Sequence, residues 1–115
     1  MDSLETDNAI IDPYWIYQLL DRMAMIKERV ITILKSSGIR LPELEERTGI
    51  SRYTWNNLKN TARKREIKAE EIEAIVKLFP KYALWVVSGK IAPEAGQTSP
   101  EYDETNSNLP NQNAV

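Results

Sequence analysis

One short stretch of the chain concentrates the side chains that can read hydrogen-bonding groups on a partner. It contains Arg52, Tyr53, Asn56, Asn57, Lys59 and Asn60. An asparagine amide presents a donor and an acceptor side by side and matches N6 and N7 of adenine, and an arginine fork matches O6 and N7 of guanine. The composition is therefore suited to reading the edges of DNA bases. The alternative is an ordinary polar helix face that lies in solvent and contacts no partner.

The residues in front of this stretch predict a short helix and a turn. Leu41 and Leu44 are three positions apart, as on one face of a helix, and Pro42 suits a first helical turn. Gly49 can end the helix because glycine adopts a positive φ at no steric cost. Ser51 then offers its hydroxyl as the N-cap of a second helix.

The second helix is expected over residues 51–61. Trp55, Leu58 and Ala62 share one of its faces and would be buried. The amide-rich side chains then lie on the other faces. Residues 41–60 are thus expected to form a helix-turn-helix.

The composition excludes several kinds of chemistry. The chain has no Cys and no His, so it can form neither a disulfide nor a Cys/His metal site, and no histidine acid or base is present. The neighbouring Glu70, Glu71 and Glu73 are explained by the preference of acids for a first helical turn. We therefore expect no enzyme activity, no cofactor, no metal and no small-molecule ligand. The acidic N-terminus and the lack of a long apolar run predict a cytoplasmic protein that does not enter membranes.

Charge is distributed unevenly along the chain. The net charge is -2, yet all 15 Lys and Arg lie between Arg22 and Lys90, where they outnumber eight Glu and leave a local charge of +7. From Arg47 to Lys68 there are seven basic residues against Glu66 alone. Local charge sets the field that a polyanion meets, so the pattern favours a nucleic-acid partner.

Three segments are expected. Residues 1–11 are acidic and without periodicity, and they predict a flexible N-terminus. Residues 12–90 predict a helical DNA-binding domain that contains the helix-turn-helix at 41–60. Residues 91–115 are rich in Pro, Ser, Asn and Gln and predict a disordered C-terminal tail.

The first helix of the domain is expected to have Asp12 as its N-cap and Pro13 as its first residue, and to be ended by Ser36-Ser37-Gly38. Apolar residues recur at helical spacing over this range, but they do not decide between one long helix and two helices that break near Met23–Met25. The start of the helix, Tyr14–Leu20, carries more apolar bulk than one face needs. It is either an extra core helix or a surface that contacts a partner.

Two closing helices are expected after a basic connection at 61–68. The first carries an apolar stripe made of Ile72, Ile75, Val76 and Phe79. The second, over residues 82–87, is short and ends at Ser88-Gly89. With these helices the fold class is all-α, a compact helix bundle with an extra N-terminal helix.

From Arg29 to Gly89 the chain resembles the lambda-repressor-like family of Cro/C1-type helix-turn-helix regulators. The resemblance rests on the Ser-Ser-Gly-Ile end of the first helix, on Leu44, on Gly49-Ile50-Ser51 and on Leu58. The sequence Leu-Phe-Pro-Lys-Tyr-Ala-Leu-Trp-Val-Val-Ser-Gly-Lys is similar to the C-terminal part of small phage and prophage regulators. Two positions depart from the family pattern: Glu45 stands where Ala is usual, and Trp55 where Val or Ile is common.

The resemblance implies a repressor that binds a palindromic operator as a homodimer, with recognition helices about 34 Å apart or a multiple of it. It implies base reading in the major groove by Arg52, Tyr53, Asn56 and Asn57. It implies phosphate contacts from Ser51, Lys59, Asn60, Arg63 and Arg65. The candidate dimer interface, outside the family's minimal domain, is formed by Tyr14, Trp15 and Leu19, with 82–87 as the second choice.

A different class of function stays open. The same fold could serve as a protein-interaction adaptor or as the antitoxin of a toxin pair. The apolar surplus at Tyr14–Leu20 and the acid-rich flanks support this alternative.

Overall fold

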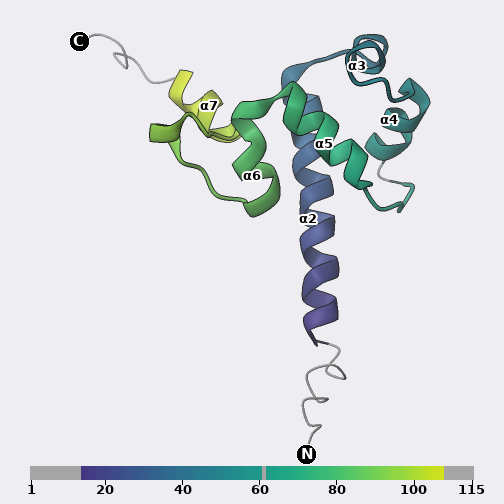
Figure 1. The fold of residues 1–115 in the computed structure, drawn as a ribbon, viewed down its shortest axis with the longest axis horizontal. Helices are drawn as coiled ribbons and strands as arrows, with labels where there is room; N and C mark the ends of the chain where they lie inside the picture. Colours follow the sequence, from purple (N-terminus) through teal and green to yellow (C-terminus); the bar gives the residue numbers. More distant parts are fainter. Residues whose placement is uncertain (1–13, 61, 108–115) are drawn as a thin grey trace, which may run out of the picture.

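The structure is a computed structural model in which the backbone of residues 14–60 and 62–107 and the side chains from Met25 onward are described (Figure 1). Its elements are, in chain order, α2 (Tyr14–Ser37), α3 (Leu41–Thr48), α4 (Arg52–Lys59), α5 (Ala69–Leu78), η1 (Pro80–Tyr82), α6 (Ala83–Ser88), η2 (Pro93–Ala95) and α7 (Pro100–Ser107). Within these ranges the only β-pairing is an isolated bridge between Ala92 and Gln97, so the all-α class is confirmed. The flexible N-terminus predicted for residues 1–11, the helix start at Asp12 and residues 108–115 lie outside the described residues.

One uninterrupted helix, α2, extends along the molecule and beyond the other helices at its amino-terminal end (Figure 1). It contains 24 residues, so the first helix is one long helix with no break near Met25. Its carboxyl-terminal part buries Val30, Ile33 and Leu34. Gly38, at a φ of 70°, follows the last turn, as the sequence predicted.

A single apolar core joins the helices. Its buried members are Val30, Ile33, Leu34, Leu44, Trp55, Leu58, Ile67, Ile75, Tyr82 and Val86. Most of them come from the periodic apolar positions of the sequence, as expected for amphipathic helices that pack around one core. Within the described part of the chain, no helix is both long enough and apolar enough to cross a bilayer.

The helix α4 is shorter than the second helix that the sequence predicted over residues 51–61. It ends at Lys59, and Ala62, which was expected on its buried face, is exposed. Asn60 leaves the helical conformation, and its side-chain oxygen accepts a hydrogen bond from the Ala62 amide at 3.0 Å. Asparagine commonly forms such local turns, which compete with the helix.

The prediction of a disordered tail is wrong for residues 91–107. This segment folds back through η2 and ends in α7, which contacts α2 (Figure 1). Polar side chains hold it in place. The Gln97 oxygen accepts from the Leu84 amide at 2.9 Å, and the Gln97 nitrogen donates to the Pro80 carbonyl at 3.1 Å. The segment was predicted to be disordered because it has few apolar residues, and composition carries no information about specific hydrogen bonds.

A charged group fastens α7 to η1. Asp103 accepts a hydrogen bond from the Tyr82 hydroxyl at 2.9 Å and pairs with the Lys81 ammonium at 3.0 Å. Burial alone would raise the pKa of Asp103, but its hydrogen bonds, first of all that with Lys81, outweigh burial and lower this pKa. The hydrogen bond to Asp103 raises the pKa of Lys81, and burial followed by the bond to Asp103 raises the pKa of Tyr82.

These shifts predict a pH window for the docking of α7. The contribution of Asp103 is complete above its ordinary pKa of 3.8 and is lost as the pH falls through the lowered value. The contributions of Tyr82 and Lys81 are complete below 10.0 and 10.5 and are lost as the pH rises through their raised values. Amide chemical shifts of α7, followed by NMR during a pH titration, would check this. Asp103→Asn should abolish the acid transition, and a variant that keeps it would contradict the assignment.

Candidate nucleic-acid interface

The turn between α3 and α4 is built around the hydroxyl of Thr48. This oxygen donates to the Leu44 carbonyl at 2.6 Å and accepts from the Ile50 amide at 3.2 Å and from the Trp55 indole nitrogen at 3.1 Å. A threonine hydroxyl can donate one hydrogen bond and accept two, so its capacity is fully used. One side chain therefore connects the end of α3, the turn and the buried face of α4.

The local signals that the sequence predicted for this turn are confirmed. Gly49 has a φ of 76° and its amide donates to the Glu45 carbonyl at 2.8 Å, which closes α3. The Ser51 hydroxyl accepts from the Tyr53 amide at 3.0 Å and caps α4. The two caps set where one helix stops and the next begins.

The eight-residue α4 has one buried and one exposed side. Trp55 and Leu58 are fully buried, whereas Arg52, Tyr53 and Asn56 are exposed, with Tyr53 at 76%. Asn57 is partly buried. The helix therefore offers a guanidinium, a phenol and an amide to a partner.

Across the turn, α3 supplies a partner for the first residue of α4. Glu45 Oε1 accepts from Arg52 Nε at 2.6 Å, and both side chains are partly exposed. Glu45 stands where Ala is usual in the lambda-repressor-like family that the sequence resembles. Its side chain forms a partly exposed contact between α3 and α4 through Arg52.

Arg65, in the loop after α4, connects α4 to the start of α5. Its guanidinium makes two hydrogen bonds to the carboxylate of Glu71, at 2.7 and 3.1 Å, and a third to the Thr54 carbonyl of α4 at 3.1 Å. Glu71 is completely buried, and its carboxylate also accepts from the Lys68 amide at 2.8 Å. From α2, Lys27 donates to the Arg65 carbonyl at 2.5 Å. These contacts give Arg65 a structural role.

Sequence reasoning did not find the roles of Thr48 and Glu71. A threonine four residues after an apolar helix position can bond back to its carbonyl, which is a weak local signal for Thr48. Glu71 is the third residue of α5, a position from which a Glu often reaches back to the helix start. That signal identifies the cap, but the pairing with Arg65 depends on the path of the connecting loop.

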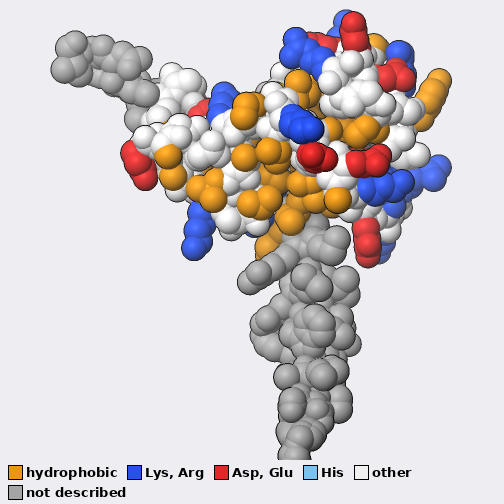
Figure 2. Space-filling model, viewed as in Figure 1, with side chains coloured by type: hydrophobic (Ala, Val, Ile, Leu, Met, Phe, Trp, Pro, Cys, Tyr) orange, Lys and Arg blue, Asp and Glu red, His pale blue; other side chains and the backbone are white. Residues whose placement is uncertain are grey.

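The basic residues of this region divide into two groups. Three of those from Arg47 to Lys68 are paired with acids: Arg47 with Glu43, Arg52 with Glu45 and Arg65 with Glu71. The other four make no ion pair within the described residues: Lys59, Arg63, Lys64 and Lys68. In Figure 2, Lys and Arg side chains gather at the α3–α4 end of the molecule, with acidic side chains among them.

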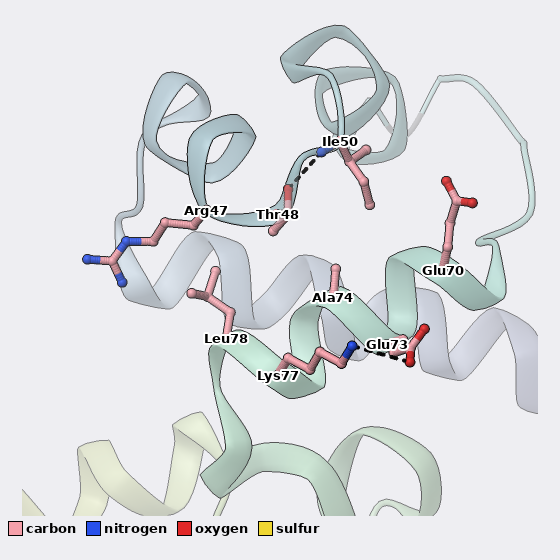
Figure 3. A pocket seen from close by; sticks show the side chains of 8 residues that line it. All are labelled: Arg47, Thr48, Ile50, Glu70, Glu73, Ala74, Lys77 and Leu78. Atoms are coloured by element: carbon pink, nitrogen blue, oxygen red, sulfur yellow. Dashed lines mark hydrogen bonds and ion pairs between the residues drawn. The ribbon is translucent and has the colours of Figure 1, made fainter.

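A separate groove lies between the turn and α5 (Figure 3). It has a volume of about 340 Å³ and is lined by Arg47, Thr48, Ile50, Glu70, Glu73, Ala74, Lys77 and Leu78. Of these residues, Glu73 and Lys77 form an ion pair within α5 at 3.5 Å (Figure 3). None of the residues predicted to read bases lines this groove, so it is a different surface from the exposed side of α4.

The predicted dimer residues Tyr14, Trp15 and Leu19 belong to α2, and their side chains lie outside the described ones. In the second candidate segment, residues 82–87, Tyr82 and Val86 are buried in the core, and Val87 is 56% exposed.

The Thr48 hydroxyl yields a stability prediction. In Thr48→Val the Ile50 amide and the Trp55 indole N–H lose their acceptor, which should lower the free energy of unfolding by about 1–3 kcal/mol. Thr32→Val is the matched control, because Thr32 is exposed and its hydroxyl only donates to the Glu28 carbonyl of its own helix. Urea unfolding of the two variants measures the difference. Equal stabilities would contradict the role given to Thr48.

Comparison with known proteins places the chain in a family. No protein-family model and no curated protein matches it. Among solved structures it is similar to Pf6r from the filamentous phage Pf6 of Pseudomonas aeruginosa PA01, with a TM-score of 0.65 and 34% sequence identity. The match covers 73% of this chain and 95% of that one. At this identity and coverage the chain belongs to the same family as the filamentous-phage protein Pf6r.

Proposed function

We propose that this protein is a sequence-specific DNA-binding transcriptional regulator of phage or prophage type, and that it represses by occupying a palindromic operator as a homodimer. The observation that carries the proposal is the division of α4, which buries Trp55 and Leu58 and exposes Arg52, Tyr53 and Asn56 directly after a capped turn. A helix held in this way can enter a major groove without disturbing the core. Membership in the family of a filamentous-phage protein supports the phage assignment.

We assign base reading to the outward side chains of α4. Arg52 and Asn56 are four positions apart and so lie on one face of the helix, with Tyr53 and Asn57 beside them. Asn56 is exposed, and its amide can make the paired hydrogen bonds that distinguish adenine. Three asparagines lower the helix propensity of this stretch, and a role in recognition would explain why they are there.

We assign phosphate contacts to Lys59 and Arg63, which make no ion pair among the described residues. The other residues predicted for this role have contacts of their own. Ser51 caps α4, the side chain of Asn60 closes a turn, and Arg65 pairs with Glu71. The homodimer is assigned to the amino-terminal turns of α2, which project from the bundle in Figure 1 and carry Tyr14, Trp15 and Leu19 in the sequence.

Selection from a pool of random-sequence duplexes tests the proposal. The protein should enrich one palindromic sequence, and the spacing of its halves reports the geometry of the dimer. Lys59→Glu combined with Arg63→Glu should abolish binding while the helical circular dichroism stays unchanged. If this variant bound the selected duplex as tightly as wild type, the adaptor function would be favoured.

Arg63 and Arg65 are predicted to act differently although they are two positions apart. Arg63→Met should flatten the slope of log K against log salt by about 0.9 and leave the stability nearly unchanged. Arg65→Met leaves the Glu71 carboxylate buried without its partner and should cost about 3–5 kcal/mol of stability. Salt titrations of DNA binding and urea unfolding separate the two effects. The same outcome for both variants would contradict the division of roles.

Asn56 provides the test of base reading. Asn56→Ala should weaken binding to the selected duplex by about 1–3 kcal/mol while binding to random duplexes stays constant. Glu46→Gln, an exposed change on α3, serves as the comparison. Equal losses on selected and random duplexes would show that Asn56 contributes no sequence preference.

A further inference from the structure

We infer that Glu45 is a specificity-determining residue of this protein: it holds the guanidinium of Arg52 by its Nε, so that the terminal amino groups are presented to one base pair. The inference rests on the proposed function, because it concerns how α4 reads DNA. Glu45 itself lies on α3 and is not among the residues assigned to contact DNA. It acts through Arg52 and is therefore a positioning residue.

The geometry of the pair leaves the reading edge of Arg52 available. A guanidinium carries five N–H groups, of which one is on Nε and four are on the terminal nitrogens. Glu45 accepts from Nε at 2.6 Å. Within residues 25–60 and 62–107 no acceptor takes the terminal N–H groups of Arg52. The two terminal nitrogens can therefore make the paired bonds to O6 and N7 of guanine.

The backbone of Glu45 is held in place at the end of α3. Its carbonyl accepts from the Gly49 amide at 2.8 Å, so its backbone is part of the closure of α3. The turn that follows is fixed by Thr48 and Ser51, which sets the position of Arg52 as the first residue of α4. An arginine side chain loses rotamer freedom when it binds a ligand, and a carboxylate that already holds it removes part of that cost.

The negative charge of Glu45 allows its two possible roles to be separated by the direction in which DNA affinity changes when Glu45 is removed. A carboxylate close to α4 repels the phosphates of DNA and neutralises the charge of Arg52. If Glu45 acted only through its charge, removing that charge would strengthen binding to every duplex. If Glu45 positions Arg52, its removal weakens binding to one sequence only. The two possibilities therefore change the affinity for the preferred duplex in opposite directions.

The experiment uses the full-length protein and the duplex that the wild type selects from a random pool. Glu45→Ala, which removes the acceptor of the Arg52 bond, is compared with Glu46→Ala, which removes the same charge one position along α3, where no ion pair is made among the described residues. Affinities are measured for the selected duplex, for each single base-pair variant of it and for a random duplex. Thermal unfolding by circular dichroism establishes that both variants are folded.

Glu45→Ala should lose about 5- to 150-fold of the preference at one base pair, the one whose preference is also lost in Arg52→Ala. Its affinity for the random duplex should be unchanged or higher. Arg52→Lys should lose the same preference, because lysine keeps the charge but has no planar fork. In an Arg52→Ala background, Glu45→Ala should have no further effect on preference.

Two results would overturn the inference. If Glu45→Ala and Glu46→Ala changed the affinity for all duplexes by the same factor, Glu45 would act only as a charge, and the proposed function would stand. If the wild type selected no sequence from the pool, the proposed function would fail and the inference would fail with it.

Discussion

The arrangement of α3 and α4 depends on the hydroxyl of Thr48. It bonds to the end of one helix, to the turn and to the buried indole of the next, so the start of α4 has little freedom to rotate against α3. Trp55 is larger than the residue common at its position in the family that the sequence resembles. A large aromatic side chain needs a partner for its N–H when it is buried, and Thr48 supplies one. The two residues are best understood as a pair.

An eight-residue helix with three asparagines in or next to it would not be stable alone, so α4 exists because its surroundings hold it. Trp55 and Leu58 anchor it in the core, and Arg65 donates a hydrogen bond to its Thr54 carbonyl. The support from Arg65 involves a completely buried carboxylate, Glu71. Such an ion pair contributes little net stability, but it has a defined geometry, and losing one partner is costly. The direction of α4 is thereby tied to α5 as well as to α3.

The sequence predicted those features that depend on neighbouring residues. The glycine that ends α3, the serine that caps α4 and the apolar positions of the core follow from local rules of spacing and conformation. It did not predict features that depend on contacts between distant segments. Arg65 looked like one more cation in a basic run, and only the path of the loop brings it to Glu71. The segment 91–107 looked disordered because its anchors, Gln97 and Asp103, are polar residues whose partners lie 13 to 21 positions away.

The exposed side chains of α4 and the charges around it indicate where the sequence preference of such a protein would arise. Binding to phosphates alone grows with the number of unpaired cations, and here three of the seven basic residues around α4 are already neutralised by acids. The segment from Arg22 to Lys90 nevertheless keeps a local charge of +7, which attracts phosphates of any sequence. Phosphate contacts carry no sequence information directly. On the proposed function, discrimination between sequences would therefore come from Arg52, Asn56 and their neighbours, and for this discrimination the rigidity of the turn that carries them would matter more than the total positive charge.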